Sequence, residues 1–185
     1  MSRKHTLKKH KKKLVAAAVT AVAAAVIGAA TLATHPKTDN SVYQPPLPTK
    51  TSQCVATAGI EDKACTPGAV IASATKAQIC KPGYSSSVRN VPESEKNQVY
   101  AAYGIATHTT GQYEVDHLIS LELGGSNDIS NLWPELANPT PGFHQKDQVE
   151  NYLHKQVCDG KLSLKQAQQE IATDWLRVYE TAVVH

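Results

Sequence analysis

Apolar residues recur every three or four positions in the last third of the chain, and this spacing predicts two amphipathic helices. In residues 143–157 the stripe consists of Val149, Leu153 and Val157, and Gly160 supplies a stop. A second helix is expected from the capping box Ser163-x-x-Gln166 to about residue 179. Its apolar stripe is Leu164, Ala167, Ile171, Trp175 and Val178. Each helix therefore has one face to bury.

Upstream of these helices the pattern changes to short strands. Residues 92–103 predict a helix ended by Gly104, and residues 113–119 (YEVDHLI) predict a strand. Residues 121–130 form a loop, because they carry Gly-Gly and Asn-Asp pairs, and residues 131–135 predict a second short strand. The order strand, loop, strand, helix, flanked by further helices, predicts a small α+β domain.

The N-terminus has the composition of a targeting segment. Seven basic residues precede an uncharged stretch, residues 14–33, which is long enough to span a bilayer as a helix. Residues 1–33 fit a cleaved signal peptide and an uncleaved signal anchor equally well. Both place the rest of the chain outside the cytoplasm, and the membrane is contacted only through residues 14–33 if they are retained. A Pro-rich linker is expected at residues 34–52 and the folded domain at residues 53–185.

Charge excludes one class of protein. Of the 19 basic residues, seven lie in residues 1–33, which contain none of the 16 acidic residues. The remaining chain therefore holds 12 basic and 16 acidic residues and is net negative. A generally basic protein that coats nucleic acid is not supported, so any such contact has to come from a local patch or a bound cation.

Four cysteines follow the leader, and an even number in an exported chain favours two disulfides. Cys54 and Cys65 are close in sequence and each lies beside turn-forming residues. Cys80 and Cys158 are far apart, and Cys158 ends a predicted helix. We expect the pairs Cys54–Cys65 and Cys80–Cys158. Zinc is the competing interpretation, but no CxxC spacing is present to support a zinc ribbon.

The pair Asp116-His117 at the end of the first predicted strand carries the candidate chemistry. Hydrolysis of a phosphodiester needs a base that takes a proton from water, and the imidazole pKa of ~6.5 suits that role. A divalent cation beside the scissile phosphate would stabilise the leaving oxygen. Asp116 and His117 point to opposite faces of a regular strand, so a bend would be needed for both to serve one site.

The segment around this pair resembles the HNH, or ββα-metal, endonuclease signature. The residues that carry the resemblance are VDHLISLELGG, NLWPE and FHQKDQVENYLHKQVCDG, and a likeness to small exported bacterial HNH-like proteins covers most of residues 65–180. The resemblance implies a ββα-metal core, His117 as general base, Asn131 as the middle Asn, and Asp116 as a metal ligand. It also implies one divalent cation (Mg²⁺, Mn²⁺ or Zn²⁺) and a nucleic acid substrate, with DNA expected. The Cys pairs that hold a structural zinc in many HNH proteins are absent.

Two sets of residues stay open as the metal ligands that the predicted helix would supply. His144 lies at the helix start, and we favour Asp116 with His144. Glu150 and His154 are spaced i, i+4 and form the alternative. A different class of function also stays open, a non-catalytic domain that binds a cell-envelope or extracellular partner on a degenerate HNH frame.

Overall fold

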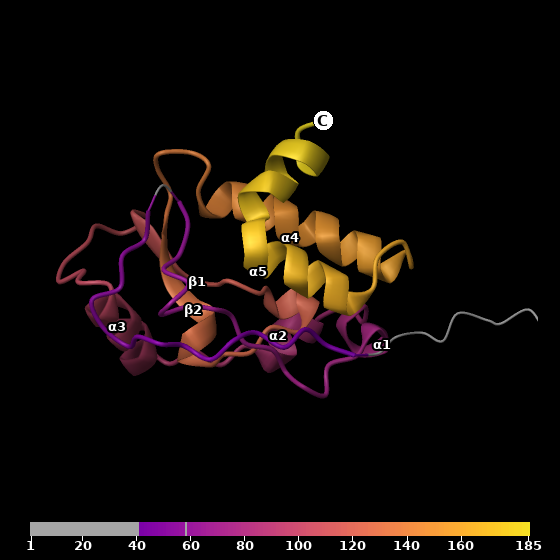
Figure 1. The fold of residues 1–185 in the computed structure, drawn as a ribbon, viewed down its shortest axis with the longest axis horizontal. Helices are drawn as coiled ribbons and strands as arrows, with labels where there is room; N and C mark the ends of the chain where they lie inside the picture. Colours follow the sequence, from indigo (N-terminus) through magenta and orange to yellow (C-terminus); the bar gives the residue numbers. More distant parts are fainter. Residues whose placement is uncertain (1–40, 58) are drawn as a thin grey trace, which may run out of the picture. The chain divides into compact units, whose positions relative to one another are not determined.

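Two short antiparallel strands and five α-helices make up the regular structure of the computed structural model, which describes residues 41–57 and 59–185 (Figure 1). Strand β1 (Tyr113–His117) pairs with β2 (Leu132–Leu136), with Tyr113 opposite Leu136 and His117 opposite Leu132. Helix α4 (Phe143–Cys158) comes after β2. The predicted order of strand, loop, strand and helix is therefore present, in a mixed α/β fold with a small sheet.

The two long helices pack together and supply much of the core. Helix α5 (Leu164–Val178) begins at the Ser163 cap with the expected capping box, and a helical turn at Tyr179–Val183 continues it. Figure 1 shows α4 and α5 side by side. The residues predicted to line their apolar stripes are all buried, between 0% and 4% exposed: Val149, Leu153, Val157, Leu164, Ala167, Ile171, Trp175 and Val178. Burial of these two facing stripes is the main apolar contribution to the fold.

The loop between the strands is folded tightly against the core. It contains two 3-10 turns, Leu121–Leu123 and Ile129–Asn131, and both begin with a side-chain cap, from Ser120 and Asp128 respectively. Gly125 is required where this loop crosses the end of β1, because a Cβ there would lie 1.8 Å from the carbonyl oxygen of Ile119. The loop therefore has one tight path, and the course of the chain after β1 is fixed.

Three shorter helices precede the sheet. Helix α3 (Glu93–Ala102) corresponds to the helix predicted at residues 92–103. Helices α1 (Lys76–Ile79) and α2 (Tyr84–Val88) were not predicted, although α1 begins with a capping box of Thr75 and Gln78. Both helices are too short to show an apolar repeat, which explains why periodicity missed them.

Two disulfides close the domain in the expected pairing. Cys54–Cys65 spans 11 positions, and Cys80–Cys158 spans 78 and joins the end of α1 to the end of α4. Their presence is typical of proteins from oxidising compartments.

The second half of the expected linker lies on the folded domain. Val42 is 7% exposed and belongs to the apolar core, and the backbone N–H of Tyr43 donates to Gln168 of α5 at 2.8 Å. The folded domain thus begins before residue 53. The predicted signal peptide or anchor at residues 1–33 lies outside the described residues. Within the described ranges, no helix has the length and apolar character needed to cross a membrane.

Candidate functional site

His117, the expected base, is the last residue of β1 and is only 3% exposed. It lines a groove of about 460 Å³ beside the sheet edge. The groove also contains side chains from α3, from the segment before it, from the loop that leads to β1 and from the start of α4. Its other lining residues are Arg89, Val91, Glu93, Lys96, Tyr100, His108, Gly111, Tyr113, Glu114, Val115 and Phe143. A nearly buried imidazole at the wall of an open groove is suitably placed to act on a bound molecule.

The side chain of Asn127 fixes the tautomer of His117. Its Nδ2 donates to the carbonyl oxygen of Val88 at 2.8 Å, and its Oδ1 accepts from the backbone N–H of Asn90 at 3.2 Å. These two backbone partners determine which end of the amide is oxygen, because a carbonyl only accepts and an N–H only donates. Oδ1 lies 3.2 Å from Nε2 of His117, so Nε2 has to carry the proton. The lone pair that can accept a proton from water is then on Nδ1.

The protonation state of His117 also suits a base. Burial lowers its pKa below the usual value, with smaller lowering from the charges of Arg89 and Lys146. Asp116 and the hydrogen bond to Asn127 oppose this shift but do not reverse it. The imidazole is therefore neutral at neutral pH and available to take a proton.

Arg89 is held beside His117 by the same amide. The residues before and after it, Val88 and Asn90, both bind Asn127, so the backbone of residues 88–90 is fixed to the loop after β1. The Arg89 side chain is exposed and lines the groove, and no carboxylate in the described part of the chain lies within 4 Å of it. A guanidinium without an ion-pair partner, next to a neutral imidazole, is suited to hold an anionic group.

The rest of the groove is aromatic and slightly acidic, because Glu114 also lines it and interacts with the charge of Arg89. Lys96 pairs with Glu93 at 3.3 Å. The rings of Tyr100 and His108 lie 4.2 Å apart, and Tyr113 contacts both rings edge-on at 6.4 and 6.2 Å. Among the lining residues, Arg89 is thus the basic side chain without a salt bridge in the described chain, and Glu114 partly offsets its charge.

Asn131 is fully engaged in holding the loop. Its Oδ1 accepts from the backbone N–H groups of Ala69 and Ile119, at 3.2 and 2.9 Å. Its Nδ2 donates to the carbonyl oxygens of Ile119 and Ser126, at 3.0 and 2.8 Å. Asn131 is 0% exposed and is not the hydrogen-bond partner of the imidazole of His117. Its contribution to the base is indirect, because it fixes the backbone on the C-terminal side of His117.

Asp116 points to the other face of β1, where it meets α4. Its Oδ2 accepts from Nζ of Lys146 at 2.5 Å, and the same Nζ donates to Oε1 of Glu150 at 2.5 Å and to the carbonyl oxygen of His117 at 2.7 Å. The side chain of Lys146 is 0% exposed. Its three donors are thereby matched with three oxygen acceptors.

Glu135 adds a third carboxyl group to this cluster. It is 0% exposed, and no donor from the described residues reaches either of its oxygens. Burial, together with the charge of Asp116, raises its pKa to about 10, so it carries a proton at neutral pH. Burial also raises the pKa of Glu150, to about 7, although Lys146 opposes the rise. For Asp116, burial would raise the pKa, but Lys146 and Glu135 hold it below the usual value.

The residues expected to bind a divalent cation do not assemble into a free ligand set. Asp116 and Glu150 share the Lys146 ammonium, and His144 is exposed on the first turn of α4 against Phe143. A cation at Asp116 would have to compete with that ammonium for the same carboxylate oxygens. The expected ligands therefore do not fit a metal while Lys146 is in place, and the divalent cation stays a prediction.

His154 lies at the other end of α4 and belongs to a different group. Its Nε2 is 3.0 Å from the carbonyl oxygen of Ile79 and 3.5 Å from Sγ of Cys158. Within residues 41–57 and 59–185, Cys80, His154 and Cys158 are the one group of three potential ligands that lie within 4.8 Å of one another. Both sulfurs are joined in the disulfide, so they are not thiolates that could bind a metal.

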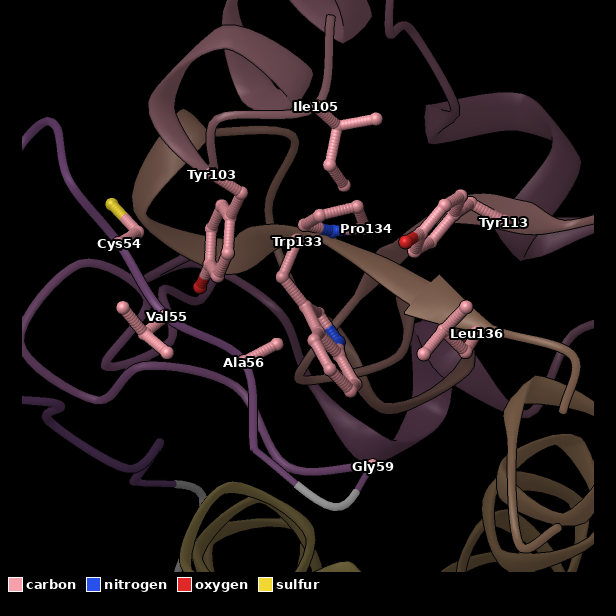
Figure 2. A pocket seen from close by; sticks show the side chains of 10 residues that line it. All are labelled: Cys54, Val55, Ala56, Gly59, Tyr103, Ile105, Tyr113, Trp133, Pro134 and Leu136. Atoms are coloured by element: carbon pink, nitrogen blue, oxygen red, sulfur yellow. The ribbon is translucent and has the colours of Figure 1, made fainter. Parts of the chain in front are cut away.

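A second pocket, of about 260 Å³, is lined by residues that include Tyr103, Tyr113 and Trp133 (Figure 2). Figure 2 shows the indole of Trp133 between Ala56 and Leu136, with Tyr103 and Tyr113 on either side. Tyr113 lines both this pocket and the groove of His117. The side chains that line the pocket are mostly apolar or aromatic, and none of its lining residues is a candidate base.

The sequence singled out His117, Asp116 and Asn131, whose functional roles stay predictions, whereas Asn127 and the place of Lys146 were missed. Asn127 lies in the expected loop, and only the fold brings residues 88–90 to it. A lysine on an amphipathic helix is normally solvated, which explains why burial of Lys146 was not expected. Comparisons with protein-family models, with curated proteins and with solved structures find no match to this chain.

Proposed function

We propose that the protein is an exported nuclease that hydrolyses phosphodiester bonds, with DNA as the expected substrate and His117 as general base. The observation that carries the proposal is the neutral His117, with its proton fixed on Nε2 by Asn127, at the wall of a groove that also contains Arg89. The order β1, β2, α4 and the resemblance of residues 113–158 to the HNH signature support the same assignment.

In the proposed reaction, Nδ1 of His117 takes a proton from water as the water oxygen attacks phosphorus. The bond from phosphorus to the leaving oxygen breaks, and that oxygen takes a proton from solvent. The guanidinium of Arg89 binds the phosphate oxygens, whose negative charge increases in the transition state. Asn127 keeps the imidazole in the competent tautomer. We derive no step from a metal, because Lys146 occupies the carboxylates that were expected to bind one.

Nicking of supercoiled plasmid by the purified disulfide-bonded protein tests the proposal. The assay is run in Mg²⁺, in Mn²⁺ and in EDTA, with wild type beside His117→Ala. We expect nicking by wild type and its loss in the variant. Nicking in EDTA would show that the reaction needs no free divalent cation. If the wild-type protein nicks neither plasmid nor single-stranded DNA under all three conditions, the nuclease proposal is wrong.

One observation favours a second candidate, a non-catalytic binding domain on a degenerate frame. Lys146 neutralises Asp116, which the HNH signature assigns to a metal, and the open pocket beside Trp133 is lined partly by the aromatic side chains of Tyr103 and Tyr113. This candidate predicts no cleavage under any condition. It also predicts that the fluorescence of Trp133 responds to a bound envelope or extracellular partner, and that His117→Ala leaves this response unchanged.

A further inference from the structure

The ammonium of Lys146 has the environment of a bound cation. Its nitrogen lies 2.5 Å from Asp116 Oδ2, 2.5 Å from Glu150 Oε1 and 2.7 Å from the carbonyl oxygen of His117. All three partners are oxygens, and they come from the end of β1 and from α4. Carboxylate and carbonyl oxygens are the ligands that hard divalent cations such as Mg²⁺ and Mn²⁺ prefer.

The cluster contains more carboxyl groups than the single positive charge of Lys146 can neutralise. Asp116 and Glu150 each pair with the single ammonium, and the buried Glu135 interacts electrostatically with both Asp116 and Lys146. Glu135 is fully buried and its oxygens receive no hydrogen bond from the described residues. Such a group is costly unless it is protonated or faces a cation. Two carboxylates and a carbonyl oxygen around one fully buried cation form the arrangement expected of a metal site in which the metal has been replaced.

We propose that Lys146 is a built-in cation that takes the place of a divalent metal between β1 and α4, so that the wild-type protein binds no metal through Asp116. The proposal has a reciprocal part: removal of the ammonium converts the cluster into a divalent-cation site formed by Asp116, Glu150 and the carbonyl oxygen of His117. It goes beyond the proposed nuclease function, because it concerns metal binding and stability, which are measured without any cleavage assay.

The test variant is Lys146→Met. Methionine reproduces the lysine stem and ends one atom short of Nζ, so the position of the ammonium becomes empty while the packing of the stem is kept. The matched control is Lys155→Met, the same change on the same helix at a side chain that is 70% exposed. Lys146→Arg is the charge-conserving control, since it retains a cation at the cluster.

The measurements are calorimetric titration with Mn²⁺ and thermal unfolding in Mn²⁺ and in EDTA. We expect wild type, Lys155→Met and Lys146→Arg to bind no Mn²⁺ at the cluster and to unfold at the same temperature in both buffers. Lys146→Met should be less stable in EDTA, and Mn²⁺ should restore stability by binding one ion per chain. We expect its affinity to exceed that of wild type roughly tenfold or more, and the further change Asp116→Asn to abolish that gain.

Two results would overturn the proposal. One is saturable Mn²⁺ binding by the wild-type protein that Asp116→Asn removes, since the metal would then displace or bypass Lys146. The other is a Lys146→Met protein whose binding and unfolding do not respond to Mn²⁺. If this variant is unfolded in EDTA, its refolding by Mn²⁺, followed by circular dichroism, supports the proposal, and failure to refold counts against it. Loss of nuclease activity in any variant leaves these outcomes unchanged.

Discussion

At the scale of single residues, the main feature of the site is that the side-chain amide of Asn127 positions two other residues, His117 and Arg89. Asn127 holds the imidazole of His117 through its oxygen and holds the backbone on both sides of Arg89 through hydrogen bonds at its two ends. The proposed base and the proposed anion-binding group are thus positioned by the same side chain. A change at Asn127 should therefore affect both proton transfer and phosphate binding.

The first prediction concerns the base itself. His117→Ala should lower cleavage by ~10²–10⁴-fold, the usual contribution of a positioned acid–base group, and should leave the fold intact. The measurement is the initial rate of plasmid nicking, with far-ultraviolet circular dichroism as the check on folding. His185→Ala, the same change at the exposed C-terminal residue, is the matched control. Equal rates for the folded His117→Ala protein and wild type would exclude His117 as the base.

The second prediction concerns the pH profile. A base acts when neutral, so kcat/KM falls as pH drops through its pKa, and burial lowers the pKa of His117 below the usual ~6.5. Asp116 and Asn127 oppose that shift, whereas Arg89 and Lys146 add to it. The wild-type acidic limb should therefore have its midpoint below ~6.5. Asn127→Asp places an anion next to the ring, favours the imidazolium and should move the midpoint up by ~1 unit or more.

Profiles of kcat/KM between about pH 5 and pH 9 check this shift. Asn151→Asp, on the exposed face of α4, controls for the added charge. Coincident acidic limbs in wild type and Asn127→Asp would mean that the limb reports a group other than His117.

At the scale of elements, the connection from β1 to β2 is held by one buried side chain. Asn131 makes four hydrogen bonds to backbone groups of residues 69, 119 and 126. Together with the close approach of Gly125 to the carbonyl oxygen of Ile119, these bonds leave the loop a single path. The end of β1 is therefore rigid from the loop side and, through Lys146, from the α4 side.

The third prediction rests on those bonds. Asn131→Ala should lower the free energy of unfolding by roughly 2–5 kcal/mol, because it leaves several backbone groups buried without partners. Urea unfolding followed by tryptophan fluorescence measures the loss. Asn151→Ala, where the side chain is exposed and donates to the carbonyl oxygen of Asp147, should change stability by about 0.5 kcal/mol or less. Similar small effects for both variants would contradict a structural role for Asn131.

At the scale of the whole molecule, the disulfides differ in the length of chain that they close. Cys54–Cys65 spans 11 positions and Cys80–Cys158 spans 78. In the chain-entropy model a longer closed loop restricts the unfolded state more, and the difference between these two amounts to about 1.7 kcal/mol.

The fourth prediction compares the two double-serine variants. Cys80→Ser with Cys158→Ser should lower the free energy of unfolding by about 1.7 kcal/mol more than Cys54→Ser with Cys65→Ser. Denaturant unfolding without reductant measures both, and the fully reduced wild-type protein is the reference in which neither bond is present. A larger loss from the short-loop pair would show that native packing around the disulfides outweighs loop length.

The sequence was informative where one local pattern decides the structure. The stripe of Val149, Leu153 and Val157 and the cap at Ser163 located α4 and α5, because a helix buries one face whatever it packs against. The pair Asp116-His117 located the end of β1. The places of Asn127 and Lys146 depend on contacts with distant segments, at residues 88–90 and 116–117, which no local spacing encodes.

The long disulfide has a consequence for how the molecule responds to proteases. Every candidate site residue from Arg89 to His154 lies between Cys80 and Cys158. Within that interval, residues 106–112 are exposed and belong to no helix or strand, which makes them a natural point of attack for a protease. A single backbone cut there yields two fragments that stay covalently joined, with β1, β2 and α4 on one fragment and Arg89 on the other. The clipped molecule migrates as one band without reductant and as two bands with it, and in an oxidising compartment it persists as a two-chain protein.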